Sequence, residues 1–371
     1  MVEELKYKNG KLFFSGIDLN SVKTPSFVFS KKQLQTSYKK AISKFNQVFK
    51  KSKAYYSLKT NSSEFVVKTL KELDSSFVIS STNEARLILK HKIKPEKCLI
   101  NQPLYSEQDI KEYLGMGFDF FAMGHERFLK LLNSNAEGKK VKYLAGIDLL
   151  AKEHSFSFSK EELLKIAKKF PKLSFKGIAF YVKTQNTEVF VWQSYVSKAL
   201  EVIKELEEQG LRVEFVDIGS GFPVEYNKSG LDGFLVLDRM KNTFSKLNDY
   251  TVILEPGRII AASCIALVVK AVMVKESDVW VDTSVYNSYL DAQIAKIKLP
   301  ALNVLKKPRK KDYNLFGNSP CGLDVFFKDK PISIVREGDK IALYNAGAYI
   351  FRTDFASNKK VEFDERSLEK N

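Results

Sequence analysis

Residues 191–218 read VWQSYVSKALEVIKELEEQGLRVEFVDI, and they join a long helical pattern to a short apolar run. From Val191 to Gln209 the apolar side chains recur with the 3.6-residue period of an amphipathic helix, and Gly210 ends the pattern. The run 213–218 then has the length of a buried strand. This order predicts a helix followed by a strand of a parallel sheet.

Seven further apolar runs of strand length alternate with helix-like stretches in the same way. With 213–218, they are 54–58 (AYYSL), 76–80 (SFVIS), 98–101 (CLIN), 119–123 (DFFAM), 143–147 (YLAGI), 177–182 (GIAFYV) and 252–255 (VILE). Eight is the number of strand–helix units that closes a TIM barrel. The sequence therefore predicts an α/β fold with a (β/α)8 TIM barrel over residues 30–258.

The pattern changes after Arg258, because β-branched and aromatic runs separated by turns replace the helical periods. These runs are 265–274 (IALVVKAVMV), 278–282 (DVWVD) and 341–351 (IALYNAGAYIF). They predict a second, mostly β domain formed by residues 259–371, which the segment 1–29 joins through a strand at 26–29.

The composition limits the kinds of partner. The 371 residues carry a net charge of +16, but the lysines are scattered, and no zinc-finger spacing or RNA-binding aromatic signature accompanies them. We therefore predict no nucleic-acid partner and no metal, and we treat the three histidines as structural or surface residues. No apolar run reaches membrane-spanning length, and the N-terminus lacks the apolar core of a signal peptide. Three widely spaced cysteines fit a reducing compartment, so a cytoplasmic protein is predicted.

Two glycine loops follow the seventh and eighth predicted strands. The first contains Gly219, Ser220 and Gly221, and the second is Glu255-Pro256-Gly257-Arg258. Loops at these two places often bind phosphate in TIM barrels. Glycine lets backbone N–H groups approach phosphate oxygens, and an arginine adds a charge-assisted hydrogen bond. A simple turn is the alternative for either loop alone, but the pair predicts a phosphate site.

Lys59 ends the first predicted strand, at the same end of the barrel as the glycine loops. A solvated surface lysine is the simpler alternative. An amine at this place could instead form an imine with an aldehyde cofactor. We therefore predict that Lys59 holds pyridoxal 5'-phosphate as a Schiff base. Glu255 would then keep the pyridine nitrogen protonated, which makes the ring an electron sink.

At these residues the sequence resembles the fold type III pyridoxal-phosphate decarboxylases, whose barrel is alanine racemase-like. This family contains ornithine, arginine, diaminopimelate and carboxynorspermidine decarboxylases. The resemblance covers nearly the whole chain in order. It is carried by Thr24–Val28, Tyr56–Asn61, Phe77–Glu84, Asp217–Pro223, Glu255–Arg258, Gly317–Asp324 and Gly347–Tyr349.

The resemblance implies a mechanism. The substrate amine displaces Lys59 from the imine, carbon dioxide leaves, and the electrons move into the ring paired with Glu255. Cys321 then protonates the carbanion, in a site shared by the two subunits of a homodimer. One alignment places Pro320 at the family's cysteine position, which leaves the register open. Tyr349 is implied to reach the phosphate.

Two departures from the family concern the cofactor. The family's histidine that stacks on the ring is replaced by Tyr181, which can still stack as an aromatic residue. Thr184 keeps a hydroxyl in the same stretch. The family's arginine on the fifth strand is missing from Leu144–Asp148.

A further departure concerns the far end of the substrate, where diamine-forming relatives bind an ammonium group with aspartates. Here Gly322 follows Cys321, Ala295 and Lys296 occupy the other usual position, and Asp291 is out of register. We predict that Lys183, Lys296 and Asp324 contact the substrate, although solvent-facing lysines are the alternative. The resemblance extends to a siderophore-biosynthesis branch of this family, which acts on amino acids conjugated to citrate, and such a substrate would fit this pocket. N-citrylornithine, an intermediate of rhizoferrin-type siderophore biosynthesis, is the main hypothesis.

Three alternatives stay open. The first is a diamine or polyamine decarboxylase that acts on ornithine, lysine or carboxynorspermidine. The second is an amino-acid racemase on the same barrel, although racemases of this fold place an arginine where this chain has Glu255. The third is a non-catalytic homologue that binds pyridoxal phosphate.

Overall fold

The computed structural model describes residues 2–136, 138, 140–150, 157–226, 232–350 and 361–369. The chain forms two compact units. The barrel unit comprises Lys39–Pro223 and Leu231–Gly257, and the sheet unit comprises Met1–Tyr38, Val224–Gly230 and Arg258–Asn371. Helix α1 (Lys31–Val48) begins in the sheet unit and ends in the barrel unit, whereas the division predicted from sequence keeps residues 30–258 together.

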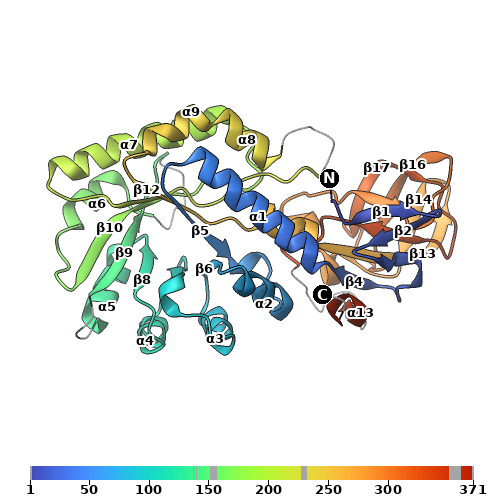
Figure 1. Ribbon diagram of the computed structural model, residues 1–371, viewed down its shortest axis with the longest axis horizontal. Coiled ribbons are helices and arrows are strands. Elements are labelled where there is room, and N and C mark those ends of the chain that lie inside the picture. Colours follow the sequence, from blue (N-terminus) through green and yellow to red (C-terminus); the bar gives the residue numbers. More distant parts are fainter. Residues whose placement is uncertain are drawn as a thin grey trace. The chain divides into compact units, whose positions relative to one another are not determined.

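The barrel unit contains a closed barrel of eight strands, each parallel to both neighbours (Figure 1). In chain order they are β5 (Ser52–Ser57), β6 (Ser76–Ile79), β7 (Cys98–Asn101), β8 (Phe120–Met123), β9 (Val141–Gly146), β10 (Leu173–Ala179), β11 (Phe215–Asp217) and β12 (Thr251–Leu254). All eight predicted strands are present, so the predicted (β/α)8 barrel is confirmed.

Strand β10 ends earlier than the sequence predicts. Its ladder ends at Ala179, which pairs with Gly146 on one side and with Asp217 on the other. The residues from Phe180 onwards therefore form a loop at the end of the barrel instead of continuing the strand.

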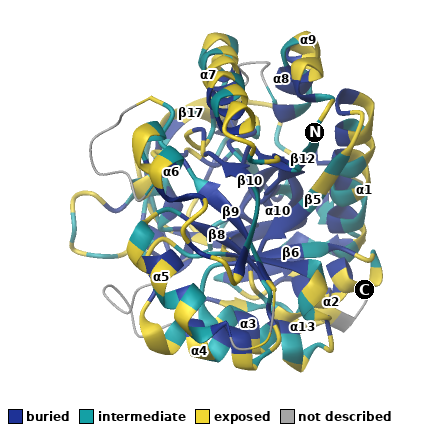
Figure 2. Ribbon diagram, turned by 90° about the vertical axis from the view of Figure 1, so that its left-hand side faces the viewer, coloured by how far each residue is buried: buried dark blue, intermediate teal, exposed yellow. Residues whose placement is uncertain are grey.

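Apolar side chains from all eight strands fill the barrel. This core consists of Tyr55, Val78, Leu99, Phe120, Ala122, Leu144, Ala179, Phe215 and Ile253. In Figure 2 the buried strands occupy the centre, and the surrounding helices turn their exposed faces outwards. These helices are α2 (Glu64–Glu72), α3 (Thr82–Lys90), α4 (Glu107–Gly115), α5 (Glu126–Asn135), α6 (Lys160–Ile166), α7 (Val189–Glu208), α8 (Gly233–Arg239) and α9 (Lys241–Phe244).

Helix α7 shows why the sequence pattern was informative. Its buried residues recur every three or four positions: Trp192, Tyr195, Val196, Ala199, Val202, Ile203 and Leu206. Gly210 follows the helix with a φ of 76°, a left-handed conformation that glycine adopts without steric cost.

The sheet unit is mostly β, as predicted. Its main sheet has the path β15 (Ala301–Asn303), β18 (Lys340–Leu343), β13 (Ile265–Lys275), β14 (Asp278–Val281), β16 (Lys310–Phe316) and β17 (Val325–Ser333). The predicted N-terminal strand is β4 (Ser26–Phe29), which pairs with β13 and with β19 (Glu362–Phe363). A separate sheet contains β1 (Leu5–Lys8), β2 (Lys11–Phe14) and β3 (Ile17–Asp18).

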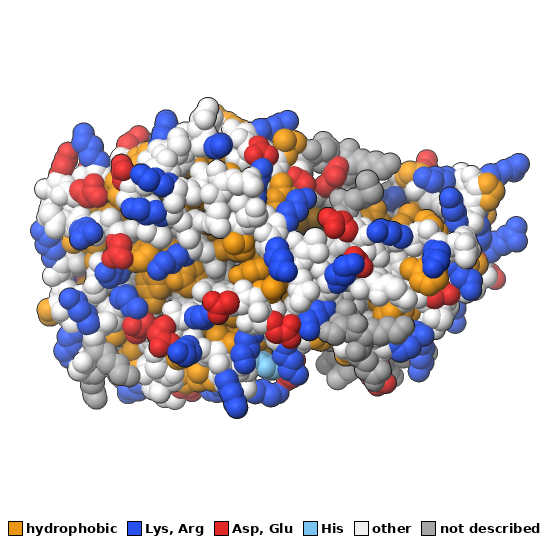
Figure 3. Space-filling model, in the orientation of Figure 1, with side chains coloured by type: hydrophobic (Ala, Val, Ile, Leu, Met, Phe, Trp, Pro, Cys, Tyr) orange, Lys and Arg blue, Asp and Glu red, His pale blue; other side chains and the backbone are white. Residues whose placement is uncertain are grey.

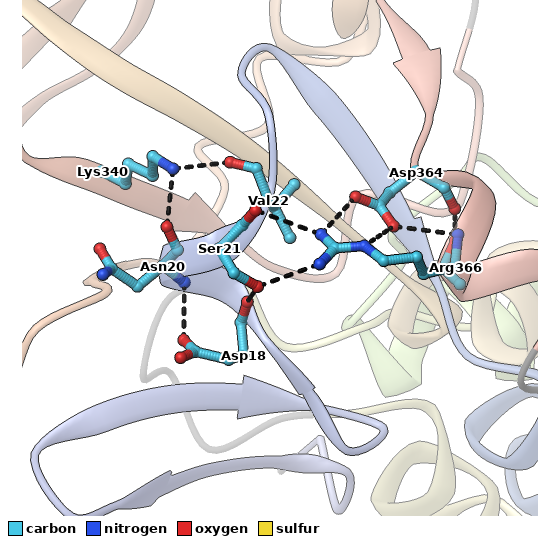
Figure 4. A network of polar contacts seen from close by, with 8 residues as sticks. Asp18, Asn20, Ser21, Val22, Lys340, Asp364 and Arg366 are labelled. Atoms are coloured by element: carbon cyan, nitrogen blue, oxygen red, sulfur yellow. Dashed lines mark hydrogen bonds and ion pairs between the residues drawn. The ribbon is translucent and has the colours of Figure 1, made fainter.

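Hydrogen bonds from the C-terminal part of the chain hold the segment that links β3 to β4 (Figure 4). Arg366 donates to the backbone oxygen of Ser21 at 3.3 Å and pairs with Asp364 at 2.8 Å. Lys340 donates to the backbone oxygens of Asn20 and Val22, both at 2.7 Å. The N-terminal and C-terminal segments of the sheet unit are therefore tied together.

Lysine and arginine side chains are scattered over the face shown in Figure 3, with acidic side chains among them. Within the described ranges, no helix is long and apolar enough to cross a lipid bilayer. The same residues contain no group of three or more His, Cys, Asp or Glu side chains that could hold a metal ion.

Candidate active site

Lys59 lies on a short 3-10 helix, Leu58–Thr60, that directly follows β5. Its neighbours Leu58 and Thr60 are buried, whereas Lys59 is exposed. The turn is fixed by its backbone, because Ser57 N–H donates to the Pro256 carbonyl at 3.1 Å and Asn61 N–H donates to the Leu58 carbonyl at 3.1 Å. A rigid turn therefore presents the Lys59 amine at the end of the barrel.

Gly257 packs directly against this turn. A Cβ atom at Gly257 would stand 2.0 Å from Thr60 Oγ1 and 3.1 Å from Thr60 Cβ, so only glycine fits. Together with the hydrogen bond between Ser57 and Pro256, this contact joins the loop after β12 to the Lys59 turn.

The loop after β12 places Glu255 inside the barrel end, with only 6% of its surface exposed. Its Oε1 accepts a hydrogen bond from Asn101 Nδ2 at 2.8 Å. Its N–H donates to the Gly219 carbonyl at 2.7 Å, and Gly219 N–H donates to Asp217 Oδ1 at 2.8 Å. Residues at the ends of β7 and β11 therefore hold Glu255, the first through its carboxylate and the second through its backbone N–H.

The first glycine loop packs on the segment that follows β10. Gly219 and Gly221 have φ values of 65° and 112°, which side chains rarely adopt. A Cβ at Gly221 would stand 2.9 Å from the carbonyl oxygens of Val182 and Lys183. A Cβ at Gly219 would stand 3.5 Å from the ring of Tyr181. The loop needs glycine for its shape, and it places Tyr181 beside Gly219.

Glu84 lies close enough to Lys59 for its carboxyl group to respond to the lysine charge. Its Oε2 accepts a hydrogen bond from Ser80 N–H at 2.7 Å. Burial raises the pKa of Glu84, while the Ser80 N–H and the charge of Lys59 act in the opposite direction. A carboxyl group with a raised pKa therefore lies near the Lys59 amine.

Arg258 is a predicted site residue of the sheet unit. Its Nη1 donates to Asp291 Oδ2 at 2.7 Å and to Tyr226 Oη at 3.1 Å, and the guanidinium lies 4.6 Å from the centre of the Tyr349 ring. Arg258 Nε is buried and has no hydrogen-bond partner among the described residues. The guanidinium is therefore held in place with a donor left for an anion. Asp291, in contrast, is committed to Arg258.

Cys321 lies on the loop between β16 and β17, and its Sγ is 3.2 Å from Tyr286 Oη. The Tyr286 O–H, followed by the Leu323 N–H, lowers the pKa of the Cys321 thiol. Burial raises the pKa of Cys98 to about 12 and also raises the pKa of Cys264. Among the three cysteines, Cys321 is thus the one suited to exchange a proton.

Asp324 holds the Cys321 loop in shape. Its carboxylate accepts hydrogen bonds from Val285 N–H and Ser319 N–H, both at 2.9 Å, and a Cβ at Gly317 would stand 2.2 Å from Asp324 Oδ1. Each carboxylate oxygen thus accepts one backbone N–H, and the substrate contact predicted for Asp324 stays a prediction.

The other predicted contacts are accessible side chains. Lys183 and Thr184 are exposed on the loop after β10, and Lys296 is exposed with a φ of 53°. The barrel unit therefore brings Lys59, Tyr181, the glycine loop, Glu255 and Gly257 to one end of the barrel. Arg258, Cys321, Asp324 and Tyr349 lie in the sheet unit.

Sequence reasoning missed Asn101, Asp217, Glu84 and Tyr286 as site residues. A signal existed for Asn101 and Asp217, because each is a polar residue at the end of an apolar strand. Glu84 lay in a quoted motif but received no role. Tyr286 carried no signal, because its partner Cys321 lies 35 residues away.

The residues fit pyridoxal phosphate. Lys59 is an accessible amine, Glu255 is a buried carboxylate, and Arg258 Nε is a buried donor without a partner. These three groups match an aldehyde, a pyridinium N–H and a phosphate, respectively.

A replacement of Gly257 by alanine is expected to displace the Lys59 turn, because the new Cβ overlaps Thr60 Oγ1. Overpacking of this kind costs about 1–3 kcal/mol of stability. Thermal unfolding and cofactor binding would measure the effect. Adding Thr60→Ala should restore much of both. Gly115→Ala, whose Cβ would meet nothing within 4 Å, is the matched control. Cofactor binding equal to the wild type in the single Gly257→Ala variant would contradict the packing argument.

A replacement of Tyr286 by phenylalanine is expected to raise the pKa of Cys321, since its principal hydrogen-bond donor is removed. The pH dependence of alkylation by iodoacetamide measures this pKa, and its midpoint should move upwards. Tyr250→Phe, which removes a hydroxyl 3.5 Å from Glu207 in the barrel unit, is the control. An unchanged midpoint in Tyr286→Phe would show that the hydroxyl does not act on the thiol.

Comparison with known proteins places these residues in a family. The family model "Pyridoxal-dependent decarboxylase, pyridoxal binding domain" matches residues 35–262, more than half of the chain. A diaminopimelate decarboxylase of Aquifex aeolicus is 24% identical over 94% of this chain and 88% of its own length. Antizyme inhibitor 2 of Xenopus laevis is 26% identical over 82% of this chain and 73% of its own length.

A solved structure shows the same fold. The lysine/ornithine decarboxylase of Vibrio vulnificus, complexed with putrescine, superimposes with a TM-score of 0.82 at 22% identity, over 93% of this chain and 95% of that chain. With the family model and the residues described above, the chain belongs to the pyridoxal-dependent decarboxylase family and is a pyridoxal-phosphate-dependent amino-acid decarboxylase.

Proposed function

We propose that the protein releases the α-carboxyl group of an amino acid while Lys59 holds the cofactor and Glu255 faces the pyridine nitrogen. The observation that carries this proposal is the direct contact between the two loops concerned. Gly257 packs on Thr60, and Pro256 accepts a hydrogen bond from Ser57. An accessible amine and a buried carboxylate are thereby fixed relative to each other.

Pyridoxal phosphate, when bound, supplies the electron sink that stabilises a carbanion at the substrate carbon. The protein supplies positioning and protons. Glu255 holds a proton at the pyridine nitrogen, Tyr181 offers an aromatic face, and Arg258 Nε offers a donor to the phosphate. Ser220 and Thr184 are further candidates for cofactor contacts. Cys321, whose thiol pKa is lowered by Tyr286, gives a proton to the substrate carbon.

The substrate is an amino acid whose far end carries a carboxylate. Two segments of the sheet unit support this proposal. The first, residues 285–298, contains the short helices α11 (Val285–Ser288) and α12 (Asp291–Ile294), and the second is the loop of residues 317–324. Their only acids are Asp291, which pairs with Arg258, and Asp324, which accepts two backbone N–H groups. Lys296 and Lys298 are exposed in the first segment. A far-end ammonium would find no uncommitted acid here, whereas a carboxylate would find lysines.

The names of the relatives support an ordinary amino acid better than a citrate conjugate. One relative is named a diaminopimelate decarboxylase, and one structural neighbour is named a lysine/ornithine decarboxylase. Diaminopimelate carries an ammonium and a carboxylate at its far end. It agrees with the names of the relatives, and its far-end carboxylate is the group that the exposed lysines would meet. N-citrylornithine, the main hypothesis from sequence, becomes the second candidate.

Carbon dioxide release from a panel of substrates tests this proposal. The purified enzyme with bound cofactor would be given diaminopimelate, lysine, ornithine and N-citrylornithine. We expect kcat/KM for diaminopimelate to exceed the values for lysine and ornithine by roughly tenfold or more, about the effect of one good ionic contact. Faster turnover of lysine or ornithine would exclude the far-end carboxylate. Faster turnover of N-citrylornithine would favour the citrate conjugate.

Two alternatives have their own readouts. A racemase would form the D-enantiomer without releasing carbon dioxide, and Glu255 argues against it. A non-catalytic homologue draws support from the relative named antizyme inhibitor 2. It would bind the cofactor and turn over no member of the panel.

The shared-site homodimer implied by the resemblance is also a proposal. Ile294 and Leu323 support it, because both are apolar and 67% exposed, and Leu323 lies two residues after Cys321. Analytical ultracentrifugation should show a dimer. A Leu323→Asp variant that remains dimeric would argue against this face as the interface.

A further inference from the structure

Two buried carboxyl groups end neighbouring strands of the barrel. Asp217 is the last residue of β11 and is 1% exposed, while Glu255 follows β12 and is 6% exposed. Asp217 pairs in register with Ile253, two residues before Glu255. Gly219 links them, because it donates to Asp217 Oδ1 and accepts from Glu255 N–H. The backbone therefore holds the two residues at neighbouring strand ends, joined through Gly219.

The second oxygen of Asp217 has no N–H or O–H donor. Asp217 Oδ2 is buried and without a hydrogen-bond partner among the described residues, and the Asp217 carboxyl group interacts with the charge of Glu255. Neutral polar groups lie near the pair, namely the hydroxyls of Tyr55 and Tyr105 and the amide of Asn101. No cation of the described residues forms an ion pair with either carboxyl group.

Two ionised carboxylates cannot share such a place at neutral pH. Burying one charge without a partner is already costly, and two like charges in contact add repulsion. Burial, followed by the charge of Glu255, raises the pKa of Asp217 well above its usual range. A proton on Oδ2 would remove the repulsion and also satisfy the atom that lacks a partner.

We propose that Asp217 is a neutral carboxylic acid that donates a hydrogen bond from Oδ2 to Glu255 and acts as its positioning residue. Glu255 then accepts from two side chains, Asn101 on Oε1 and Asp217. The pair carries one proton and one negative charge. It therefore presents a single, oriented carboxylate to the pyridine nitrogen. This inference rests on the proposed role of Glu255, but the protonation of Asp217 can be measured without any cofactor.

Protonation of Asp217 has a consequence for stability. An aspartate in the unfolded chain titrates near 3.9, and the pKa of Asp217 is higher in the folded state. Between about pH 4 and the folded pKa of Asp217, the folded state therefore binds more protons than the unfolded state. The free energy of unfolding falls as the pH rises through this range. Asp217→Asn, which is always neutral, should lose this part of the decline. Denaturant titrations at several pH values measure the difference.

Infrared spectroscopy of the cofactor-free protein locates the proton. We expect the carbonyl stretch of a protonated carboxylic acid at pH 7, and we expect Asp217→Asn to lack it. Glu84→Gln is the control, because it removes another carboxyl group whose pKa is raised by burial. This variant should keep the band that Asp217→Asn lacks. Absence of the band in the wild type would overturn the proposal. A band that persists in Asp217→Asn and disappears in Glu255→Gln would place the proton on Glu255 and also overturn it.

Cofactor binding separates positioning from mere packing. Asparagine keeps both contacts of neutral Asp217, an acceptor for Gly219 N–H and a donor to Glu255. Asp217→Asn should therefore bind pyridoxal phosphate like the wild type and keep the pH profile of its absorbance. Asp217→Ala should bind it roughly tenfold to a hundredfold more weakly, the range for a hydrogen bond to a charged group. Equal losses in both variants would show that the carboxylate form is required and would overturn the proposal.

If Glu255 proved irrelevant to the cofactor, the infrared result would be unchanged. Cofactor binding would then be the same in Glu255→Gln as in the wild type. Failure of the proposed function and failure of this inference are therefore distinguishable.

Discussion

Replacement of Lys59 by alanine should abolish carbon dioxide release and the absorbance of the covalently held cofactor. Lys59 is an exposed amine on a rigid turn, and its neighbours Leu58 and Thr60 are buried. The rate should fall by roughly a thousandfold or more, because the group that forms the covalent bond is lost. Absorbance spectra and carbon dioxide assays of the purified variant measure both effects.

The fold should survive this substitution, since the Lys59 side chain contributes little to the core. Lys51→Ala is the matched control, because Lys51 is an exposed lysine just before the same strand. Its activity and spectrum should equal those of the wild type. Unchanged absorbance in Lys59→Ala would mean that another residue holds the cofactor. Loss of secondary structure by circular dichroism would show that the side chain has a structural role that its exposure does not indicate.

The barrel could be predicted from the sequence because its signal is local. Each strand is a short apolar run, and each core residue, such as Leu99 or Ile253, lies within such a run. The ends of the strands are also marked, because Gly219, Gly221 and Gly257 are needed where the backbone turns or packs closely. A parallel barrel gathers all the carboxyl ends of its strands at one end. The position of Lys59 near the glycine loops follows from that topology alone.

The pairing of side chains could not be predicted in this way. Asn101 and Glu255 are 154 residues apart, and they meet only because β7 and β12 belong to the same closed ring. Arg258 was predicted to contact phosphate, but the sequence does not reveal that Asp291 would bind one of its nitrogens. Asp324 was predicted to contact substrate, yet the loop around it uses its carboxylate for two N–H groups. Such contacts depend on register and loop shape, and a single sequence carries no local signal for either.

Replacement of Glu255 by glutamine should lower carbon dioxide release by roughly a hundredfold, within the range for loss of a group that holds a catalytic proton. Glutamine keeps the shape of the side chain and can still accept the hydrogen bond from Asn101. It cannot keep a proton on the pyridine nitrogen, because it carries no negative charge. The electron sink is then weakened while the packing is preserved. Single-turnover measurements with saturating substrate would place the loss in the chemical step.

The position of Glu255 allows this loss to be separated from a general loss of charge. Glu214→Gln removes another carboxylate, one that pairs with Lys176 at 2.6 Å just before β11, and it should leave the rate unchanged. Glu255→Asp retains the charge on a shorter side chain, so it should recover part of the activity that Glu255→Gln loses.

If Glu255→Gln kept full activity, the pyridine nitrogen would not need a carboxylate. The chain would then resemble a racemase in its electronics, and the D-enantiomer should be sought among its products. If the aspartate and glutamine variants were equally slow, the position of the carboxylate would matter more than its charge, and the hydrogen bond from Asn101 would become the feature to test next.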